Sequence, residues 1–256
     1  MSTLQPQFFH RVSAPALAYH SYWSENSPYP TVLFLGGFRS DMQGSKALYF
    51  EQACRQRQQP FVRFDYRGHG QSAGVFTEGT IGLWLADALA VFDQLTVGPV
   101  LLVGSSMGGW IGLLLARARA ERVCGFVGIA AAPDFTREIW EERMSAVDKE
   151  TLMQQGFIDV PNHYSLEPYT ITERLLADGA EHYILENAPL IQGPVHLVQG
   201  MKDEDVLWQT APRLKDALSR AGNHTVTVHL IEDGNHRLSR PEDLVLIDRL
   251  IESYRT

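Results

Sequence analysis

The chain has 256 residues, of which 45% are hydrophobic and 20% are charged, so it is long and apolar enough for one large α/β domain or two small ones. Its formal net charge of −8 is opposite in sign to the surface of most nucleic-acid-binding proteins, and we expect no nucleic-acid partner. The absence of a run of about 18 apolar residues excludes a membrane-spanning helix, and two cysteines are too few for a disulfide framework or a zinc site.

Short apolar blocks of strand length alternate with helical segments along most of the chain. The predicted strands cover residues 31–35, 61–64, 100–103, 123–129, 195–198 and 225–231. The predicted helices cover residues 80–95, 109–120, 208–221 and 241–254, and segments 8–12 and 17–22 are expected to add antiparallel edge strands. Continuous apolar strands suit a sheet that is covered on both faces, so the alternation predicts a mostly parallel, doubly wound α/β sheet.

The stretch from residue 133 to residue 190 interrupts this alternation and is too long for a simple crossover. We interpret it as a helical cap insertion over the carboxyl ends of the strands, with residues 1–132 and 191–256 forming the α/β core. Its helix-like pieces lie near 135–144, 149–155 and 171–185.

The insertion carries twelve acidic and four basic residues and therefore the whole net charge of the chain, which we interpret as a solvated surface. Its large apolar side chains either line a pocket or anchor the insertion to the sheet. These residues are Trp140, Met144, Met153, Phe157, Tyr164 and Tyr169.

A Gly-x-Ser-x-Gly pattern, residues 104–108, follows the predicted strand 100–103 directly and leads into a predicted helix. In this setting the pattern indicates a tight elbow that presents the central serine above the sheet, and Ser106 is therefore the candidate nucleophile. Gly104 and Gly108 lack a Cβ atom and allow the strand and the helix to approach each other. The alternative interpretation is a glycine-rich turn with buried serines.

A serine hydroxyl needs a base, usually a histidine that is held by a carboxylate. His236 follows the last predicted strand and a short turn, which is the expected place for the base. His69 also follows a strand, but it precedes Ser106 and so has the wrong chain order. His196 and His229 lie within predicted strands and are expected to be structural.

The candidate acid is Asp203, because it is the first carboxylate after the predicted strand 195–198 and has the most fixed position. Glu204 and Asp205 are neighbours that could replace it, and Asp233 could bond to His236 from the same loop. The oxyanion of the transition state also needs donors. We expect them to be the backbone N–H of Met107, which follows the nucleophile, and that of Phe38, in the glycine-rich loop after strand 31–35.

Four blocks of the sequence together resemble one branch of the α/β-hydrolase superfamily, which contains the abhydrolase-domain mitochondrial palmitoyl-protein thioesterase and acyl-glucuronide esterase and its bacterial relatives. The blocks are residues 35–48, 63–72, 103–110 and 200–203. The resemblance implies the α/β-hydrolase fold and a catalytic triad of Ser106, Asp203 and His236. It also implies the hydrolysis of carboxylic esters and acyl thioesters.

The predicted function is therefore that of a serine hydrolase that forms an acyl-enzyme on Ser106, acts on a small-molecule acyl ester or thioester, and needs no metal or organic cofactor. A second interpretation keeps the fold without catalysis, as a small-molecule receptor. A third, a nucleotide-binding P-loop, is disfavoured because Ser45 and Ala47 break the required Gly-Lys-Ser/Thr pattern around Lys46. Since no transit peptide is evident, we expect a cytoplasmic protein; the oligomeric state stays open.

Overall fold

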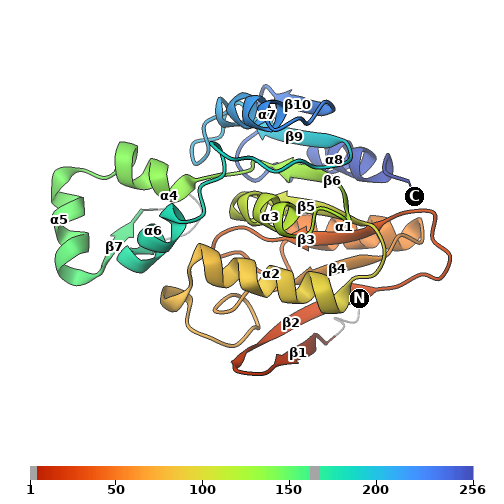
Figure 1. The fold of residues 1–256 in the computed structure, drawn as a ribbon, viewed down its shortest axis with the longest axis horizontal. Helices are drawn as coiled ribbons and strands as arrows, with labels where there is room; N and C mark the ends of the chain where they lie inside the picture. Colours follow the sequence, from red (N-terminus) through yellow and green to blue (C-terminus); the bar gives the residue numbers. More distant parts are fainter. Residues whose placement is uncertain (1–4, 162–167, 256) are drawn as a thin grey trace.

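The computed structural model describes residues 5–161 and 168–255, and a sheet of eight strands runs through its centre (Figure 1). The strands lie across the sheet in the order β1-β2-β4-β3-β5-β6-β9-β10. Their bounds are β1 Gln7–Arg11, β2 Ala14–Tyr22, β3 Thr31–Leu35, β4 Phe61–Phe64, β5 Val100–Ser105, β6 Val123–Ile129, β9 Val195–Gly200 and β10 Val226–Ile231.

Within this sheet the pairs β4–β3, β3–β5, β5–β6, β6–β9 and β9–β10 are parallel, and only β1 and β2 add antiparallel pairs at one edge. The six strands and the edge pair predicted from the sequence are thus confirmed; β3, β4 and β6 have the predicted bounds, and the ends of the others differ by one to three residues. In this register Leu35 lies opposite Gly104 and Ser105 lies opposite Ile129. The carboxyl ends of β3, β5 and β6 therefore finish at the same edge of the sheet.

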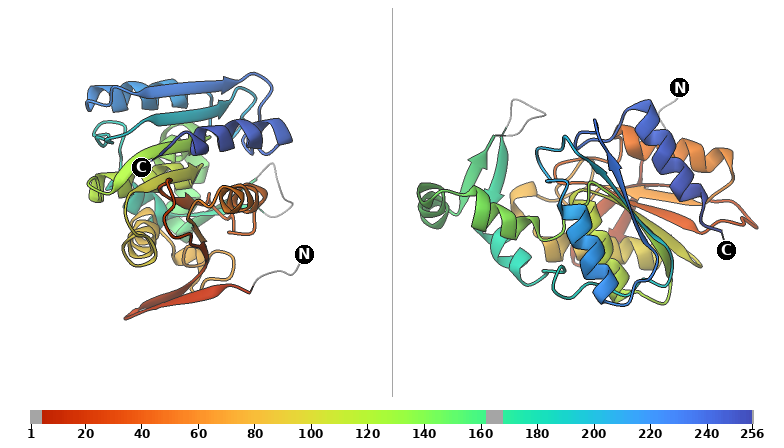
Figure 2. Two further views of the ribbon diagram at one scale, coloured as in Figure 1. Left: turned by 90° about the vertical axis from the view of Figure 1, so that its right-hand side faces the viewer. Right: turned by 90° about the horizontal axis from the view of Figure 1, so that it is seen from above.

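Helices cover both faces of the sheet, as Figures 1 and 2 show. Three helices pack on one face, namely α2 Ile81–Leu95, α3 Met107–Ala118 and α7 Thr210–Arg220. Two helices pack on the other, namely α1 Ser45–Gln56 and α8 Pro241–Glu252. The predicted helices correspond to α2, α3, α7 and α8, whereas α1 and the short 3-10 helix η1 Phe76–Glu78 were not anticipated.

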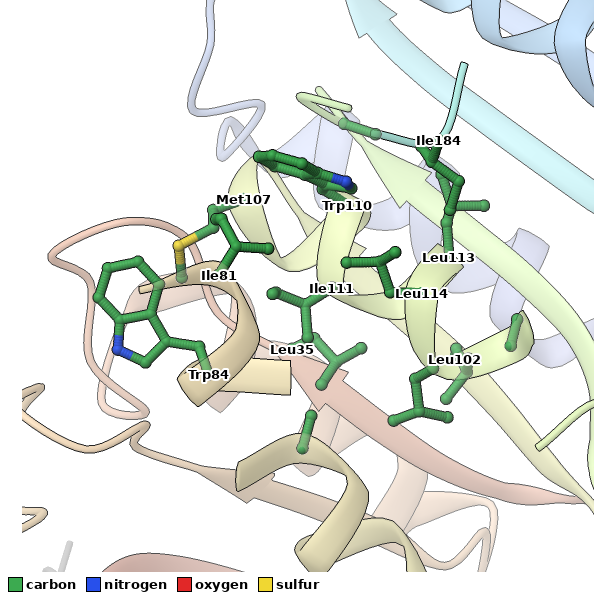
Figure 3. Close-up of a cluster of buried hydrophobic side chains, with 14 of the residues drawn as sticks. Leu35, Ile81, Trp84, Leu102, Met107, Trp110, Ile111, Leu113, Leu114 and Ile184 are labelled. Carbon is green, nitrogen blue, oxygen red and sulfur yellow. The ribbon is translucent and has the colours of Figure 1, made fainter. Parts of the chain in front are cut away.

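The larger of the two cores lies between the sheet and the α2–α3 pair (Figure 3). Met107 and Ile111 of α3 and Ile81 of α2 are fully buried there, in the same cluster as Trp84. Ile184, from the end of the insertion, also reaches this core. The helix that begins at the elbow is therefore fixed by packing along its whole buried side.

The insertion leaves the sheet between β6 and β9 and projects beyond the layers of the core (Figure 1). It is not all helical as predicted, because β7 and β8 form an antiparallel pair within it. The alternating Val, Ile and Thr residues of this pair favour a strand over a helix. Its elements are α4 Phe135–Glu138, the π-helical turn η2 Ile139–Arg143, α5 Ala146–Gln155, β7 Phe157–Val160, β8 Tyr169–Thr172 and α6 Glu173–Ala180.

The two ends of the insertion are joined by one buried carboxylate. Asp134 accepts hydrogen bonds from the backbone N–H groups of Ile184 at 2.7 Å and Leu185 at 3.1 Å. The indole N–H of Trp110 in α3 donates to the carbonyl of His182 at 3.0 Å. Burial raises the pKa of Asp134, and these two N–H donors oppose that shift. The entry and exit of the insertion are therefore held together on the core.

Substitution of Gly108 tests how closely the strand, the elbow and the helix must approach. A Cβ atom at this position would lie 2.1 Å from the carbonyl oxygen of Leu35 and 2.5 Å from that of Gly36. Because both obstacles are backbone atoms, we expect Gly108→Ala to lower the free energy of unfolding by about 3 kcal/mol in urea titrations.

Gly98→Ala is the control, since Gly98 has a positive φ of 66° but open space around a Cβ atom. We expect it to lower the free energy of unfolding by only about 1 kcal/mol. Equal stability of the two variants would contradict the close approach at Gly108.

Candidate active site

Ser106 sits at a sharp turn between β5 and α3, with φ of 54° and ψ of −120°. A non-glycine residue in this region is strained by about 1–3 kcal/mol, and the strain persists only where surrounding contacts hold it. Here the N–H of Ser106 donates to the carbonyl of Ile129 at 2.9 Å, and its carbonyl accepts from Gly109 at 2.8 Å and Ala132 at 3.1 Å. The elbow is thus fixed by the end of β6 and the first turn of α3.

Two hydrogen bonds connect the three side chains that the sequence singled out. The Nε2 atom of His236 lies 3.1 Å from the Oγ atom of Ser106, and its Nδ1 atom lies 2.8 Å from the Oδ2 atom of Asp203. Because the carboxylate can only accept, Nδ1 carries the proton and Nε2 is free to accept from the hydroxyl. The three residues come from the ends of β5, β9 and β10 and meet at one edge of the sheet.

The carboxylate of Asp203 is fully buried and has a partner on each side. Its Oδ1 atom accepts from the N–H groups of Asp205 at 2.9 Å and Val206 at 2.8 Å. Its Oδ2 atom accepts from the Nε2 amide of Gln199 at 2.9 Å as well as from His236. The sequence analysis missed Gln199, although a lone amide at the end of an apolar strand was a usable signal.

The loops that carry Asp203 and His236 are tied to each other and to α1. The N–H groups of Met201 and Lys202 donate to the carbonyls of Ile231 and Gly234, each at 2.9 Å. The ammonium group of Lys46 donates to the carbonyl of Arg237 at 2.5 Å, and burial lowers the pKa of this lysine to about 8. Lys46, which the P-loop interpretation would assign to a nucleotide site, therefore holds the loop that carries His236.

A glycine-rich loop, residues 36–40, passes directly beside the elbow. A Cβ atom on Gly37 would lie 3.4 Å from the Cβ atom of Ser106. The carbonyl of Gly37 accepts from the N–H of Ser40 at 3.2 Å and from its hydroxyl at 2.7 Å. Since this peptide is trans, the N–H of Phe38 points away from Ser40. Within residues 5–161 and 168–255, neither this N–H nor that of Met107 has an acceptor.

A cavity of about 800 Å³ opens over Ser106 between the core and the insertion. Its charged lining residues are three arginines and four acids, namely Arg39, Arg143, Arg237, Glu138, Asp148, Asp159 and Asp205. Most of its other lining is apolar and includes Phe38, Ala132, Phe135, Ile139, Met144, Ile158, Val160, Tyr169, Ile171 and Val206.

Only part of the predicted apolar lining is found there. Met144 and Tyr169 line the cavity, whereas Trp140, Met153 and Phe157 are exposed elsewhere on the insertion. Tyr164, the remaining candidate, lies outside the described residues. The insertion thus contributes lining residues that its hydrophobic pattern alone did not identify.

Asp203, Asp205 and His236 also form the one group in the described ranges whose donor atoms lie close enough, within 4.8 Å, to share a metal ion. However, both oxygens of Asp203 and both ring nitrogens of His236 already take part in hydrogen bonds. A cation would have to break these bonds, so the arrangement suits proton transfer better than metal binding.

The site and the sheet define the class of protein, and the comparison with known families agrees. The sequence profile described as "Alpha/beta hydrolase family" matches residues 32–246. The chain therefore belongs to the α/β-hydrolase family, and this membership supports hydrolase activity.

Individual relatives give a narrower relation. The mouse enzyme named palmitoyl-protein thioesterase ABHD10, mitochondrial, is 36% identical over 254 residues, which is 97% of this chain and 83% of the relative. The solved mouse structure of α/β-hydrolase domain-containing protein 10 superposes with a TM-score of 0.87 at 32% identity, covering 97% of both chains. A solved structure from Agrobacterium vitis S4 superposes with a TM-score of 0.90 at 38% identity and the same coverage.

The curated relatives contradict the predicted cytoplasmic location. The curated mouse and human proteins, each of which matches 97% of the chain, are mitochondrial by name. The expectation rested on the composition of the first residues, which is weaker evidence than similarity over the whole chain. In the described part of the chain, no helix is both long and apolar enough to span a membrane.

A second histidine, His69, is 3% exposed behind the loop 36–40, and burial lowers its pKa from the ordinary value of 6.5 to about 4. Between pH 4 and pH 6.5, His69 binds a proton more readily in the unfolded chain than in the folded one. The folded state therefore loses stability as the pH falls from 6.5 to 4. The pKa difference corresponds to a loss of about 3 kcal/mol. We expect His69→Phe to remove this loss.

The measurement is the free energy of unfolding of both proteins at several pH values. Other titrating groups contribute alike to the two curves and cancel in the difference. Parallel curves between pH 4 and 6.5 would show that His69 is not buried in its neutral form.

Proposed function

We propose that this protein is a serine hydrolase that cleaves carboxylic esters or acyl thioesters through an acyl-enzyme on Ser106. The observation that carries the proposal is the continuous hydrogen-bonded connection from Asp203 through His236 to Ser106 at the base of a cavity. Such a connection gives a weak hydroxyl nucleophile a base in the correct tautomer.

In the first step, Ser106 attacks the acyl carbonyl while Nε2 of His236 takes the hydroxyl proton. Asp203 holds the imidazole in its orientation and stabilises the imidazolium. His236 then donates the proton to the leaving alcohol or thiol. In the second step, water repeats the attack on the acyl-enzyme and releases the acid.

We assign the oxyanion hole to the backbone N–H groups of Phe38 and Met107. The N–H of Met107 belongs to the first turn of α3, where the helix dipole favours negative charge. The N–H of Phe38 is directed by the bonds from Ser40 to the preceding carbonyl. Two donors that have no other acceptor in the described residues are suited to the charge that develops on the carbonyl oxygen.

We further propose that residues 1–132 and 191–256 form the catalytic core and that residues 133–190 act as the cap. The cavity lining from α4, η2, β7 and β8 supports this division, because these elements of the insertion face Ser106 across the cavity. The largely apolar lining fits an acyl chain. The name of the mouse relative, a palmitoyl-protein thioesterase, also supports a thioester substrate.

The first test is covalent labelling by a fluorophosphonate, followed by intact-mass analysis, together with turnover of p-nitrophenyl esters of graded chain length. We expect labelling and turnover in the wild type and neither in Ser106→Ala. The control is Ser105→Ala, because the neighbouring serine lines the same cavity, whereas the hydroxyl that lies 3.1 Å from Nε2 of His236 belongs to Ser106. Undiminished labelling of Ser106→Ala would reject the nucleophile, and labelling without turnover would indicate the non-catalytic receptor.

The second test concerns the acid. In Asp203→Asn the amide oxygen takes the place of Oδ1, which faces two backbone N–H donors, so the NH2 group faces Nδ1 of His236. His236 then loses the tautomer in which Nε2 is an acceptor, and we expect kcat to fall by roughly 10³- to 10⁴-fold. Asp205→Asn is the matched control, since this carboxylate is close to His236 but only its backbone N–H bonds to Asp203.

We expect kcat of Asp205→Asn to stay within about tenfold of the wild type, because the bonds of Asp203 persist. The reverse order of the two effects would transfer the role of the acid to Asp205. Thermal melting of each variant shows whether the fold is intact.

A further inference from the structure

His69 is a buried histidine that the proposed mechanism does not use. It lies in the segment after β4, near the carboxyl edge of the sheet, and is 3% exposed. Its ring packs edge-on against the rings of Phe76 and Trp84, with centroids 5.1 and 5.2 Å away. A polar ring in an aromatic enclosure is stable only if both ring nitrogens have partners.

Both nitrogens have a backbone partner, and these partners determine the tautomer. The Nδ1 atom lies 3.2 Å from the carbonyl oxygen of Arg67, which can only accept, so Nδ1 carries the proton. The Nε2 atom accepts a hydrogen bond from the N–H of Arg39 at 3.2 Å. Burial lowers the pKa of His69 to about 4, which keeps the ring neutral and able to accept at neutral pH.

The residue that His69 holds is the one that follows Phe38. Arg39 has a positive φ of 56°, a left-handed conformation that is unfavourable for a non-glycine residue. Its N–H belongs to the peptide between residues 38 and 39, while Ser40 holds the preceding peptide through the carbonyl of Gly37. The two peptide planes that meet at the Cα atom of Phe38 are therefore each fixed by a hydrogen bond, one to Ser40 and the other to His69.

The ring of Phe38 is held by the same enclosure. Its centroid lies 4.9 Å from that of Phe76 and 5.8 Å from that of Trp84, the two rings that also contact His69. The side chain and the backbone of this residue are thus positioned by one cluster that lies behind the cavity. A change in His69 that leaves the aromatic packing intact alters only the backbone support.

We propose that His69 is a positioning residue that holds the loop 36–40 so that the N–H of Phe38 points at the oxyanion of the reaction. This inference rests on the proposed function, because the oxyanion exists only if Ser106 attacks a carbonyl. His69 does not line the cavity; it acts through the bond to the N–H of Arg39. Without that bond the left-handed turn at Arg39 relaxes, the adjoining peptides rotate, and the Phe38 donor leaves its place.

Loss of a whole oxyanion donor costs about 10²- to 10³-fold in kcat, so a displaced donor should cost about 10- to 100-fold. The loss falls on kcat and leaves KM nearly unchanged, because the donor strengthens its bond only as charge develops on the oxygen.

Four variants separate this role from a structural one. His69→Phe keeps a ring of similar size and removes the acceptor. His69→Gln places an amide oxygen near the position of Nε2, whereas His69→Asn is one methylene too short to reach Arg39. His20→Phe is the matched control, because His20 is also buried, at 5% exposure, and its pKa is also lowered by burial, but it lies in β2.

The readouts are kcat and KM for a p-nitrophenyl ester, the melting temperature, and the Ki of an alkyl trifluoromethyl ketone. This ketone forms a hemiketal: Ser106 Oγ bonds to the carbonyl carbon, the C=O π bond opens to an oxyanion, and His236 takes the hydroxyl proton. Its affinity therefore reports the oxyanion donors directly. We expect the Phe and Asn variants to lose kcat and ketone affinity by the same factor, and the Gln variant and His20→Phe to stay within about threefold of the wild type.

A kcat of His69→Phe within threefold of the wild type overturns the proposal, as does a loss of kcat without a matching rise in Ki. If His69→Phe does not fold, the comparison of Gln with Asn decides, because equal activity of these two variants also overturns it. Long-range proton–nitrogen NMR spectra of the wild type add a test that needs no activity: a proton on Nε2 of His69 excludes acceptance from Arg39. A wild type without ester turnover refutes the proposed function instead.

Discussion

The site depends on one close approach of backbone to backbone. The chain can place a serine at a φ of 54° between β5 and α3 only because neither Gly104 nor Gly108 carries a Cβ atom, which would meet the backbone of the helix or of β3. The contact brings the loop after β3 beside Ser106 and sets the first turn of α3 below it. The positions of the proposed nucleophile, of the helix N-terminus and of the neighbouring loop thus have one geometric cause.

The same kind of close backbone approach occurs where the proposed acid and base meet. A Cβ atom on Gly200 would lie 2.4 Å from the carbonyl oxygen of Gly234, so the chain segments after β9 and β10 pass each other at backbone distance. Asp203 and His236 follow these crossing points by two or three residues. Their side chains therefore have little freedom, and the 2.8 Å bond between them forms without the ordering of long flexible segments.

Much of the core could be read from the sequence, because short apolar strands and amphipathic helices carry strong periodic signals. The triad candidates followed from chain order and strand ends, and the structure brings Ser106, Asp203 and His236 together. The missed parts have physical reasons. Helix α1 buries the charged residue Glu51 beside Ala47, Phe50 and Cys54, so its buried face lacks a purely apolar pattern, and the β7–β8 pair lies in an insertion whose alternation is short. The bonds of Gln199, Lys46 and His69 are tertiary, so local patterns do not report them.

The carboxylate of Asp134 has a consequence for how such a fold can diversify. Since it accepts hydrogen bonds from the backbone N–H groups of residues 184 and 185, the two ends of the intervening segment lie side by side. A change in the length or shape of this segment can therefore leave its attachment to the core unchanged, and with it the distances around Ser106. Under the proposed function, substrate selectivity can then change within the insertion while Ser106, Asp203 and His236 keep their arrangement.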